Sequence, residues 1–185
     1  KSYGGMLETV KKETEKLLAF LMSDFGFSES RLAAVFSGGR GYHIHVRDQR
    51  ILSLGSDERR EIVDYLAGRG LEMDRFIVMA PMEGDWGKDR AFRLRAPAAE
   101  SAGWGKRINR SIVSFVHSLR QQSEADAIAL LSKRKGIGPK RASSFYHSLQ
   151  KENVLKEIAS GNLDLFRGSA PIWKILLEEF LDEEG

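Results

Sequence analysis

A glycine-rich turn between two short apolar segments constrains the fold of this chain more than any other feature. Residues 37–46 read SGGRGYHIHV, and the apolar run LAAVF occupies residues 32–36 just before them. The run predicts a buried strand that ends in a tight turn, and the alternation that begins at Tyr42 predicts a second strand. The sequence therefore predicts two strands joined by a turn of unusual chemistry.

The second strand separates its side chains by chemistry. Side chains alternate along a strand, so Tyr42, Ile44 and Val46 share one face. His43 and His45 share the opposite face. If the apolar face packs on a core, we expect both imidazoles to face open space.

The turn, residues 37–41, combines groups that bind anions. Arg40 is expected to share the open space of the two imidazoles, and the glycines leave backbone N–H groups that would point there too. An anion can approach the backbone closely because glycine has no side chain. This combination favours a polyphosphate ligand. In the alternative interpretation the histidines only hydrogen-bond to backbone groups, but a turn that binds nothing has no obvious need of three glycines.

The pattern S-G-x-R-G-x-H over residues 37–43 resembles the second signature motif of archaeal and eukaryotic DNA primase catalytic (small) subunits. Residues 17–25 before the motif and residues 43–66 after it resemble the archaeal branch. The resemblance implies a DNA-dependent nucleotidyltransferase that synthesises short primers for DNA replication. It also implies a primase large subunit, a single-stranded DNA template and nucleoside triphosphates as partners.

In that family the motif's Ser, Arg and His hold the triphosphate of the incoming nucleotide, which assigns this role to Ser37, Arg40 and His43. Many relatives have Arg at the position of Gly39, so one phosphate contact is either missing here or supplied elsewhere. The resemblance thus gives a phosphate-binding set of Ser37, Gly38, Arg40, Gly41 and His43.

The carboxylates that the family uses for catalysis are not found. Members carry an Asp-x-Asp pair upstream of the motif and a third Asp downstream, and these hold two metal ions, Mg²⁺ or Mn²⁺. No Asp-x-Asp occurs in the 185 residues, and residues 91–97 only faintly resemble the downstream pattern. The cysteines that bind zinc in the family are also absent, and the chain begins at Lys1 without Met. We therefore expect an internal fragment that is inactive alone and has no catalytic residue of its own; a degenerate paralogue is the alternative.

Composition agrees with this interpretation but decides little. A chain that is 42% hydrophobic and 30% charged is globular, with room for one domain or two small ones. There is no transmembrane run or signal-peptide pattern, so we expect no membrane partner and a cytoplasmic location. The resemblance implies a prokaryotic, archaeal source. A net charge of +3 permits nucleic acid as a partner without requiring it.

Periodicity predicts an α+β fold. A helix over residues 7–25 is ended by Gly26, and a second helix begins at Ser56, whose hydroxyl is expected to cap it. Residues 75–80 predict a short buried strand, and residues 81–106 are rich in loop-forming residues.

Only helices are predicted from Lys106 onward, with Trp104 and Trp173 as core residues. We therefore expect a partial primase-type mixed α/β catalytic domain over residues 1–102. A helical accessory domain follows over residues 103–185, as in archaeal primase small subunits, which also carry a helical region after this motif.

A second motif, GIGPKRA, occupies residues 136–142 and resembles the helix-hairpin-helix element of DNA repair and replication proteins. Gly136 and Gly138 permit a tight turn, and Pro139 suits the first position of a helix. The exposed N–H groups of that helix start, with Lys140 and Arg141, would bind a DNA phosphate without sequence preference. This motif carries the alternative function, a non-catalytic DNA-binding module; in the simplest interpretation it is only a helix–helix corner.

Other residues have weaker alternatives. His45 shares a face with His43, but without cysteine or a carboxylate pair nearby zinc is disfavoured. A phosphate or template contact, or a buried neutral histidine, remains open. Arg47 is a further candidate for phosphate or template, or for an ion pair with Asp48, although a solvated side chain is the favoured interpretation.

Two more charged segments are expected to have no role of their own. The charges around Trp86, at Asp85, Lys88, Asp89 and Arg90, predict either a loop near the site or a plain surface loop. The acidic residues 178–184 predict a solvated helix end.

Overall fold

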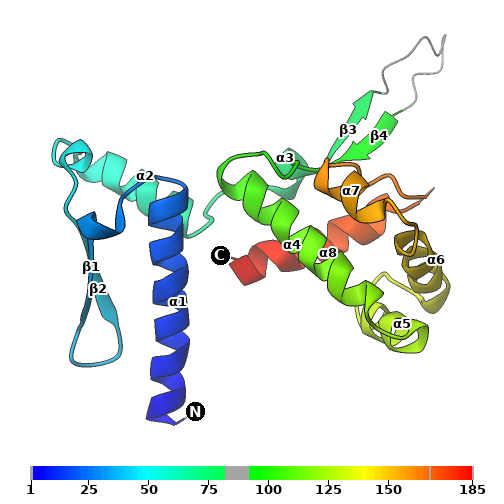
Figure 1. Ribbon diagram of the computed structural model, residues 1–185, viewed down its shortest axis with the longest axis horizontal. Helices are drawn as coiled ribbons and strands as arrows, with labels where there is room; N and C mark the ends of the chain where they lie inside the picture. The colour runs from blue at the N-terminus through cyan, green and yellow to red at the C-terminus, as the bar shows by residue number, and fades with distance from the viewer. Residues whose placement is uncertain (1, 82–91, 167, 185) are drawn as a thin grey trace. The chain divides into compact units, whose positions relative to one another are not determined.

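A computed structural model describes residues 2–81, 92–166 and 168–184. The chain forms two compact units, Lys1–Arg69 and Gly70–Gly185, which are described separately. The structure combines helices with small antiparallel sheets, so the predicted α+β class is confirmed (Figure 1).

The first unit places a two-stranded hairpin beside a long helix (Figure 1). Its elements are α1 (Tyr3–Ser23), η1 (Glu29–Arg31), β1 (Leu32–Phe36), β2 (Tyr42–Val46), η2 (Gln49–Ile51) and α2 (Ser56–Leu66). The predicted first helix and its stop are confirmed, since Gly26 follows with φ +66°. The predicted cap of α2 is wrong: Ser56 is already helical and the cap position is Gly55, which has no side chain to bond the free N–H groups.

The hairpin pairs β1 with β2 in antiparallel register, Phe36 opposite Tyr42. The predicted faces of β2 are confirmed, because its apolar side chains are half-buried while His43 and His45 are exposed. The predicted burial of β1 is wrong, since Val35 and Phe36 are 49% and 44% exposed. A two-stranded sheet leaves one face and both edges uncovered unless other elements pack on it.

The core of the first unit is small, and Arg50 ties its parts together. Only three side chains in this unit's described residues are buried hydrophobics: Phe20, Leu21 and Phe27. The Arg50 guanidinium donates to the carbonyls of Phe25 and Gly26 and lies 4.9 Å from the ring centroid of Phe27. It also pairs with Asp48 at 2.9 Å, and this hydrogen bond lowers the pKa of Asp48 to about 2. The predicted alternative pair of Arg47 with Asp48 is therefore wrong.

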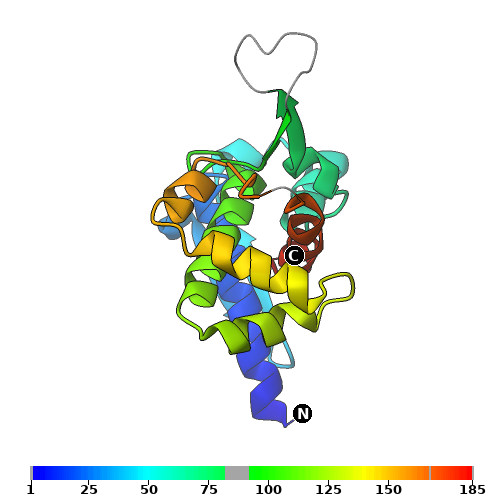
Figure 2. The same ribbon diagram turned by 90° about the vertical axis from the view of Figure 1, so that its right-hand side faces the viewer.

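The second unit is mainly helical, with one small sheet. Its elements are α3 (Met73–Phe76), β3 (Val78–Pro81), β4 (Phe92–Arg95), α4 (Gly103–Arg120), α5 (Glu124–Ser132), α6 (Pro139–Leu149), α7 (Val154–Ala159) and α8 (Ala170–Glu184). Figure 2 shows α5 and α6 running side by side. Trp173 is fully buried against Phe145, and its Nε1 donates to the carbonyl of Leu163. Trp104 is also buried, so both predicted core tryptophans are confirmed.

Predictions for residues 75–106 are confirmed only in part. A strand does form, but it spans Val78–Pro81 instead of residues 75–80, because Met73–Phe76 are helical. The predicted burial is wrong, since of residues 75–80 only Ile77 is buried. Phe92–Arg95, predicted as loop, forms β4 and pairs with β3. A short apolar run does not distinguish a buried strand from a helix end followed by an exposed hairpin.

The two compact units divide the chain at residue 69, whereas the sequence places a domain boundary at residue 102. The strand β4 belongs to the second unit because it is bonded to the segment after α7. Ala96 N–H donates to the carbonyl of Gly161, and Leu163 N–H donates to that of Leu94. The division into domains 1–102 and 103–185 stays a prediction.

Candidate phosphate-binding hairpin

The turn between β1 and β2 is closed by two hydrogen bonds between its ends. Ser37 N–H donates to the carbonyl of Gly41 at 2.9 Å, and Gly41 N–H donates to Ser37 Oγ at 3.2 Å. Gly38 has φ +78°, a conformation that favours glycine. Because Ser37 Oγ acts as an acceptor here, its own O–H is still available to donate to a ligand.

The tip of the turn leaves backbone donors free. Among the residues that the structure describes, the N–H groups of Gly38, Gly39 and Arg40 have no acceptor. Gly39 does not have a positive φ, and a Cβ built on it would meet no atom within 4 Å. The fold therefore requires glycine at Gly38 but not at Gly39, where the missing side chain only keeps the backbone accessible.

The turn is tied to the start of α1. The Tyr3 hydroxyl donates to the carbonyl of Gly39 at 2.8 Å. Arg40 is exposed, has no partner among the described residues, and lines a hollow of about 350 Å³. The other residues lining this hollow belong to α1: Tyr3, Met6, Leu7, Thr9 and Val10. Arg40 thus lies beside α1 in this arrangement, and His43 is not among the residues that line the hollow.

The two histidines of β2 are surface residues. His43 and His45 are opposite Val35 and Ala33 in the register and are exposed, so the alternative of a buried neutral histidine is wrong. In the described part of the chain, no three His, Cys, Asp or Glu side chains gather to hold a metal ion. Arg47 is also exposed and continues the same face of the strand.

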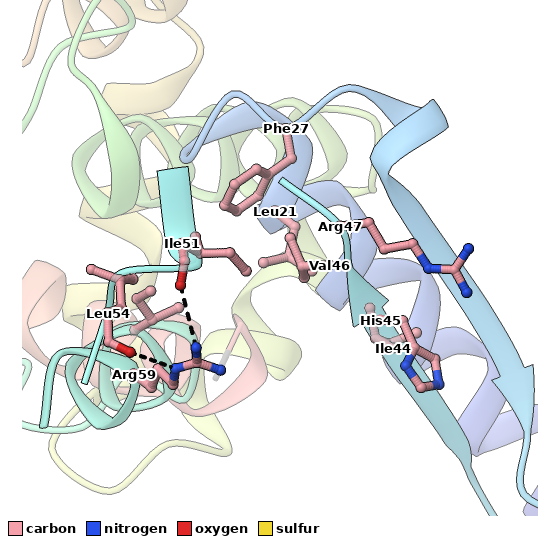
Figure 3. A pocket seen from close by; sticks show the side chains of 10 residues that line it. Leu21, Phe27, Ile44, His45, Val46, Arg47, Ile51, Leu54 and Arg59 are labelled. Carbon is pink, nitrogen blue, oxygen red and sulfur yellow. Dashed lines mark hydrogen bonds between the residues drawn. The ribbon is translucent and has the colours of Figure 1, made fainter. Parts of the chain in front are cut away.

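A second hollow, of about 420 Å³, lies beside β2 and was not predicted (Figure 3). In Figure 3 Val46 points toward Leu21, whereas the Arg47 side chain extends away from it. Arg59 closes one side by donating to the carbonyls of Leu54 and Ile51. The remaining lining residues are Phe27, Ile44, His45 and Ile62. Four separate elements contribute this lining, so periodicity within any one of them does not indicate it.

The predicted helix–turn–helix corner forms in the second unit. Gly136 has φ +100°, Ile137 is buried, and Gly138 occupies the cap position before Pro139, the first residue of α6. No side chain caps this helix start. The predicted positions of both glycines and of the proline are therefore confirmed, while contact with DNA stays a prediction.

The cations around this corner differ in their surroundings. Lys140 and Arg141 are exposed and have no partner among the described residues. Arg134 instead donates to Glu179 at 2.7 Å and to the carbonyl of Leu130. Glu179 on α8, one residue of the predicted solvated segment 178–184, therefore neutralises part of the cationic corner.

Some of the predictions fall outside the described residues. The charges around Trp86, namely Asp85, Lys88, Asp89 and Arg90, belong to this group. Within the described ranges, no helix is both long and apolar enough to span a membrane.

Comparison with known proteins identifies relatives over nearly the whole chain. The profile described as "DNA primase small subunit" matches residues 5–164. The DNA primase small subunit PriS of Methanothrix thermoacetophila is 51% identical over 178 residues, covering 96% of this chain and 45% of the relative. PriS of Methanococcoides burtonii is 42% identical over 98% of this chain and 46% of the relative. PriS of Haloarcula marismortui is 39% identical over 96% of this chain and 44% of the relative.

The chain thus spans a little less than half the length of these curated relatives. No solved structure matches it. The family match covers the turn and most of the helical unit, and the identities extend over both compact units. This chain therefore belongs to the DNA primase small subunit family.

Proposed function

We propose that the whole protein is a DNA-dependent nucleotidyltransferase that synthesises primers, and that this part holds the triphosphate of the incoming nucleotide. The observation that carries the proposal is the turn with three unbonded N–H groups, next to an arginine without a partner. A single-stranded template and the primase large subunit are the proposed partners of the whole protein.

Each group of the turn has a role toward phosphate oxygens. Arg40 supplies a charged, planar pair of donors, which suits a phosphate better than a single N–H does. The Ser37 hydroxyl and a ring N–H of His43 add neutral donors, and Gly38 and Gly41 fix the backbone around them. His45 and Arg47 extend the same exposed strand face and are proposed to contact the template or a further phosphate.

The metal chemistry of the family is not assigned to this chain. The Mg²⁺ or Mn²⁺ ions of the whole protein would need a cluster of carboxylates, and the described residues hold no such cluster. The same holds for zinc, because the chain has no cysteine. The proposal for this part is therefore binding and charge neutralisation, with no catalytic step of its own.

Replacing Arg40 tests the proposal directly. Arg40→Ala is expected to raise the dissociation constant for ATP or dATP about ten- to hundredfold, because a charge-assisted contact is lost. The measurement is calorimetric titration of each nucleotide into the chain. Since Arg40 bonds to nothing in the described residues, the midpoint of thermal unfolding should not change.

Arg60→Ala is the matched control, since Arg60 is also exposed and without a partner but lies on α2. It should leave nucleotide affinity unchanged. Equal affinities for the Arg40 variant and the unmodified chain would remove Arg40 from the phosphate site. In the whole protein, an unchanged KM for nucleotide in primer synthesis by the Arg40→Ala variant would contradict the proposal in the same way.

We also propose that the corner at Gly136, Gly138, Lys140 and Arg141 contacts a DNA backbone. The observation that favours it is a helix start without a side-chain cap, next to two cations that have no partner among the described residues. Lys140→Glu combined with Arg141→Glu is expected to weaken binding of a DNA oligonucleotide more than tenfold at low salt while nucleotide binding persists. Unchanged DNA affinity in an electrophoretic shift assay would leave the corner with a purely structural role.

A further inference from the structure

The face of α4 that points away from the core carries a row of polar and cationic side chains. The helix buries one apolar face, made of Trp104, Ile108, Ile112, Val116 and Leu119, together with Asn109. Lys106, Arg110, Ser114 and His117 are exposed. At about 100° per residue these four fall within about 80° of the helix circumference, opposite the buried face. We call these four residues the α4 stripe.

Among the residues that the structure describes, the exposed cations of the α4 stripe are not neutralised. The helix contains four Lys or Arg residues and no Asp or Glu. Within the described part of the chain, Lys106, Arg110 and His117 have no hydrogen-bond or ion-pair partner. Some other cations of this unit are paired, since Lys174 contacts Asp74 at 2.9 Å and Arg134 contacts Glu179 at 2.7 Å. A rigid helix therefore presents unpaired cations at fixed positions.

We propose that the α4 stripe binds the sugar–phosphate backbone of single-stranded DNA. At 1.5 Å per residue, Lys106 and His117 lie about 16 Å apart along the axis, a span that covers several successive phosphates. Lys and Arg side chains and serine hydroxyls are the groups that usually contact phosphates. That the DNA is a primase template rests on the proposed function, whereas contact with a DNA backbone rests on the stripe itself.

The composition of the stripe argues against other partners. A membrane-surface helix needs an exposed apolar face, but the apolar face of α4 is buried in the core. The centres of protein interfaces usually contain aromatic or aliphatic anchors, and the stripe has none. Charge complementarity with a polyanion is what remains, and DNA supplies regularly spaced charges.

Removing two charges from the stripe tests the inference. The variant combines Lys106→Gln with Arg110→Gln, and the probe is a fluorescein-labelled oligonucleotide of twenty thymidines. Fluorescence anisotropy should show at least about tenfold weaker binding at 50 mM KCl. The slope of log affinity against log salt should fall in magnitude by about 1.4, because each phosphate contact contributes about 0.7. Both side chains are solvent-exposed, so the circular dichroism spectrum and melting midpoint should not change.

The matched control is Lys11→Gln with Lys12→Gln on α1, which removes the same charge from another exposed helix surface. An equal loss of DNA affinity in this control would show a general effect of net charge and overturn the inference. Unchanged affinity or salt slope in the stripe variant would overturn it too. A competition experiment gives a third test, in which poly-glutamate and unlabelled thymidine oligonucleotide are compared at equal charge and concentration. If poly-glutamate displaces the labelled oligonucleotide as effectively as unlabelled oligonucleotide does, the inference is also overturned. Titration of the stripe variant with ATP keeps the proposed function separate, since nucleotide binding should persist whether or not the stripe binds DNA.

Discussion

Gly161→Ala is expected to destabilise the second compact unit by more than about 3 kcal/mol, which is among the largest effects a single methyl group can have. Gly161 has φ +85°, and a Cβ at this position would lie 2.4 Å from the carbonyl oxygen of Ala96. The Ala96 segment cannot easily retreat, because Ala96 N–H donates to the carbonyl of Gly161 at 2.9 Å. A second hydrogen bond holds the same two segments together, because Leu163 N–H donates to the carbonyl of Leu94 at 3.1 Å.

Urea unfolding followed by tryptophan fluorescence measures this effect, because Trp104 and Trp173 are both buried in the second unit. Gly168→Ala is the control: Gly168 also has a positive φ, +95°, but no atom lies within 4 Å of its Cβ position. Gly168→Ala should lower the free energy of unfolding by only about 1 to 2 kcal/mol, the cost of placing alanine at a positive φ. Equal losses for the two variants would contradict the expectation and show that the Ala96 segment moves aside.

The local structure of the candidate phosphate-binding turn could be predicted from sequence, but the elements that pack against its strands could not. Alternation along 42–46 gives the two faces of β2, because side-chain direction depends only on the strand itself. The exposure of Val35 and Phe36 depends on what packs against β1, and no feature within residues 32–36 encodes it. The position of Arg40 beside α1 could not be predicted either, because it also depends on which element packs against the hairpin.

Contacts between residues far apart in sequence escaped prediction most completely. Tyr3 and Gly39 are 36 residues apart, and Arg134 and Glu179 are 45 apart. Charge runs indicate which side chains are available to pair, but they do not show which partner the fold brings near. Arg134 stands between Lys133 and Lys135 in the sequence, and nothing in that run indicates that Glu179 pairs with it.

The helical unit was easier to predict because its apolar periodicity is strong. The pattern at Ile108, Ile112 and Val116 marks the buried face of α4, and all three side chains are fully or almost fully buried. The same pattern leaves Asn109 unexplained, because position 109 falls at the edge of an apolar stripe. Only the fold shows why a polar residue is buried there.

Asn109→Leu is expected to destabilise the second unit by about 2 to 4 kcal/mol, although it adds apolar surface to the core. Asn109 is 3% exposed, and its Nδ2 donates to the carbonyls of Pro97, Ile158 and Ala159 at 2.8, 3.2 and 3.3 Å. Leucine would leave the Pro97 carbonyl without this donor, and a buried acceptor that loses its partner is destabilising because its hydration is not restored. The carbonyls of Ile158 and Ala159 would keep one donor each, the N–H groups of Gly161 and Ala99. Urea unfolding again provides the measurement.

Asn109→Asp separates the lost hydrogen bonds from a simple misfit of volume, because aspartate has nearly the shape of asparagine. An ionised carboxylate would face carbonyl oxygens, so the pKa of the folded variant should rise above that of the unfolded chain. A raised folded pKa gives stability that is present at low pH and lost as the pH rises. We therefore expect the aspartate variant to be less stable at pH 7 than at pH 4, relative to the unmodified chain at each pH. Equal relative stability at both values would mean that water or a shifted backbone satisfies the three carbonyls, and that Asn109 does not hold α4 in place.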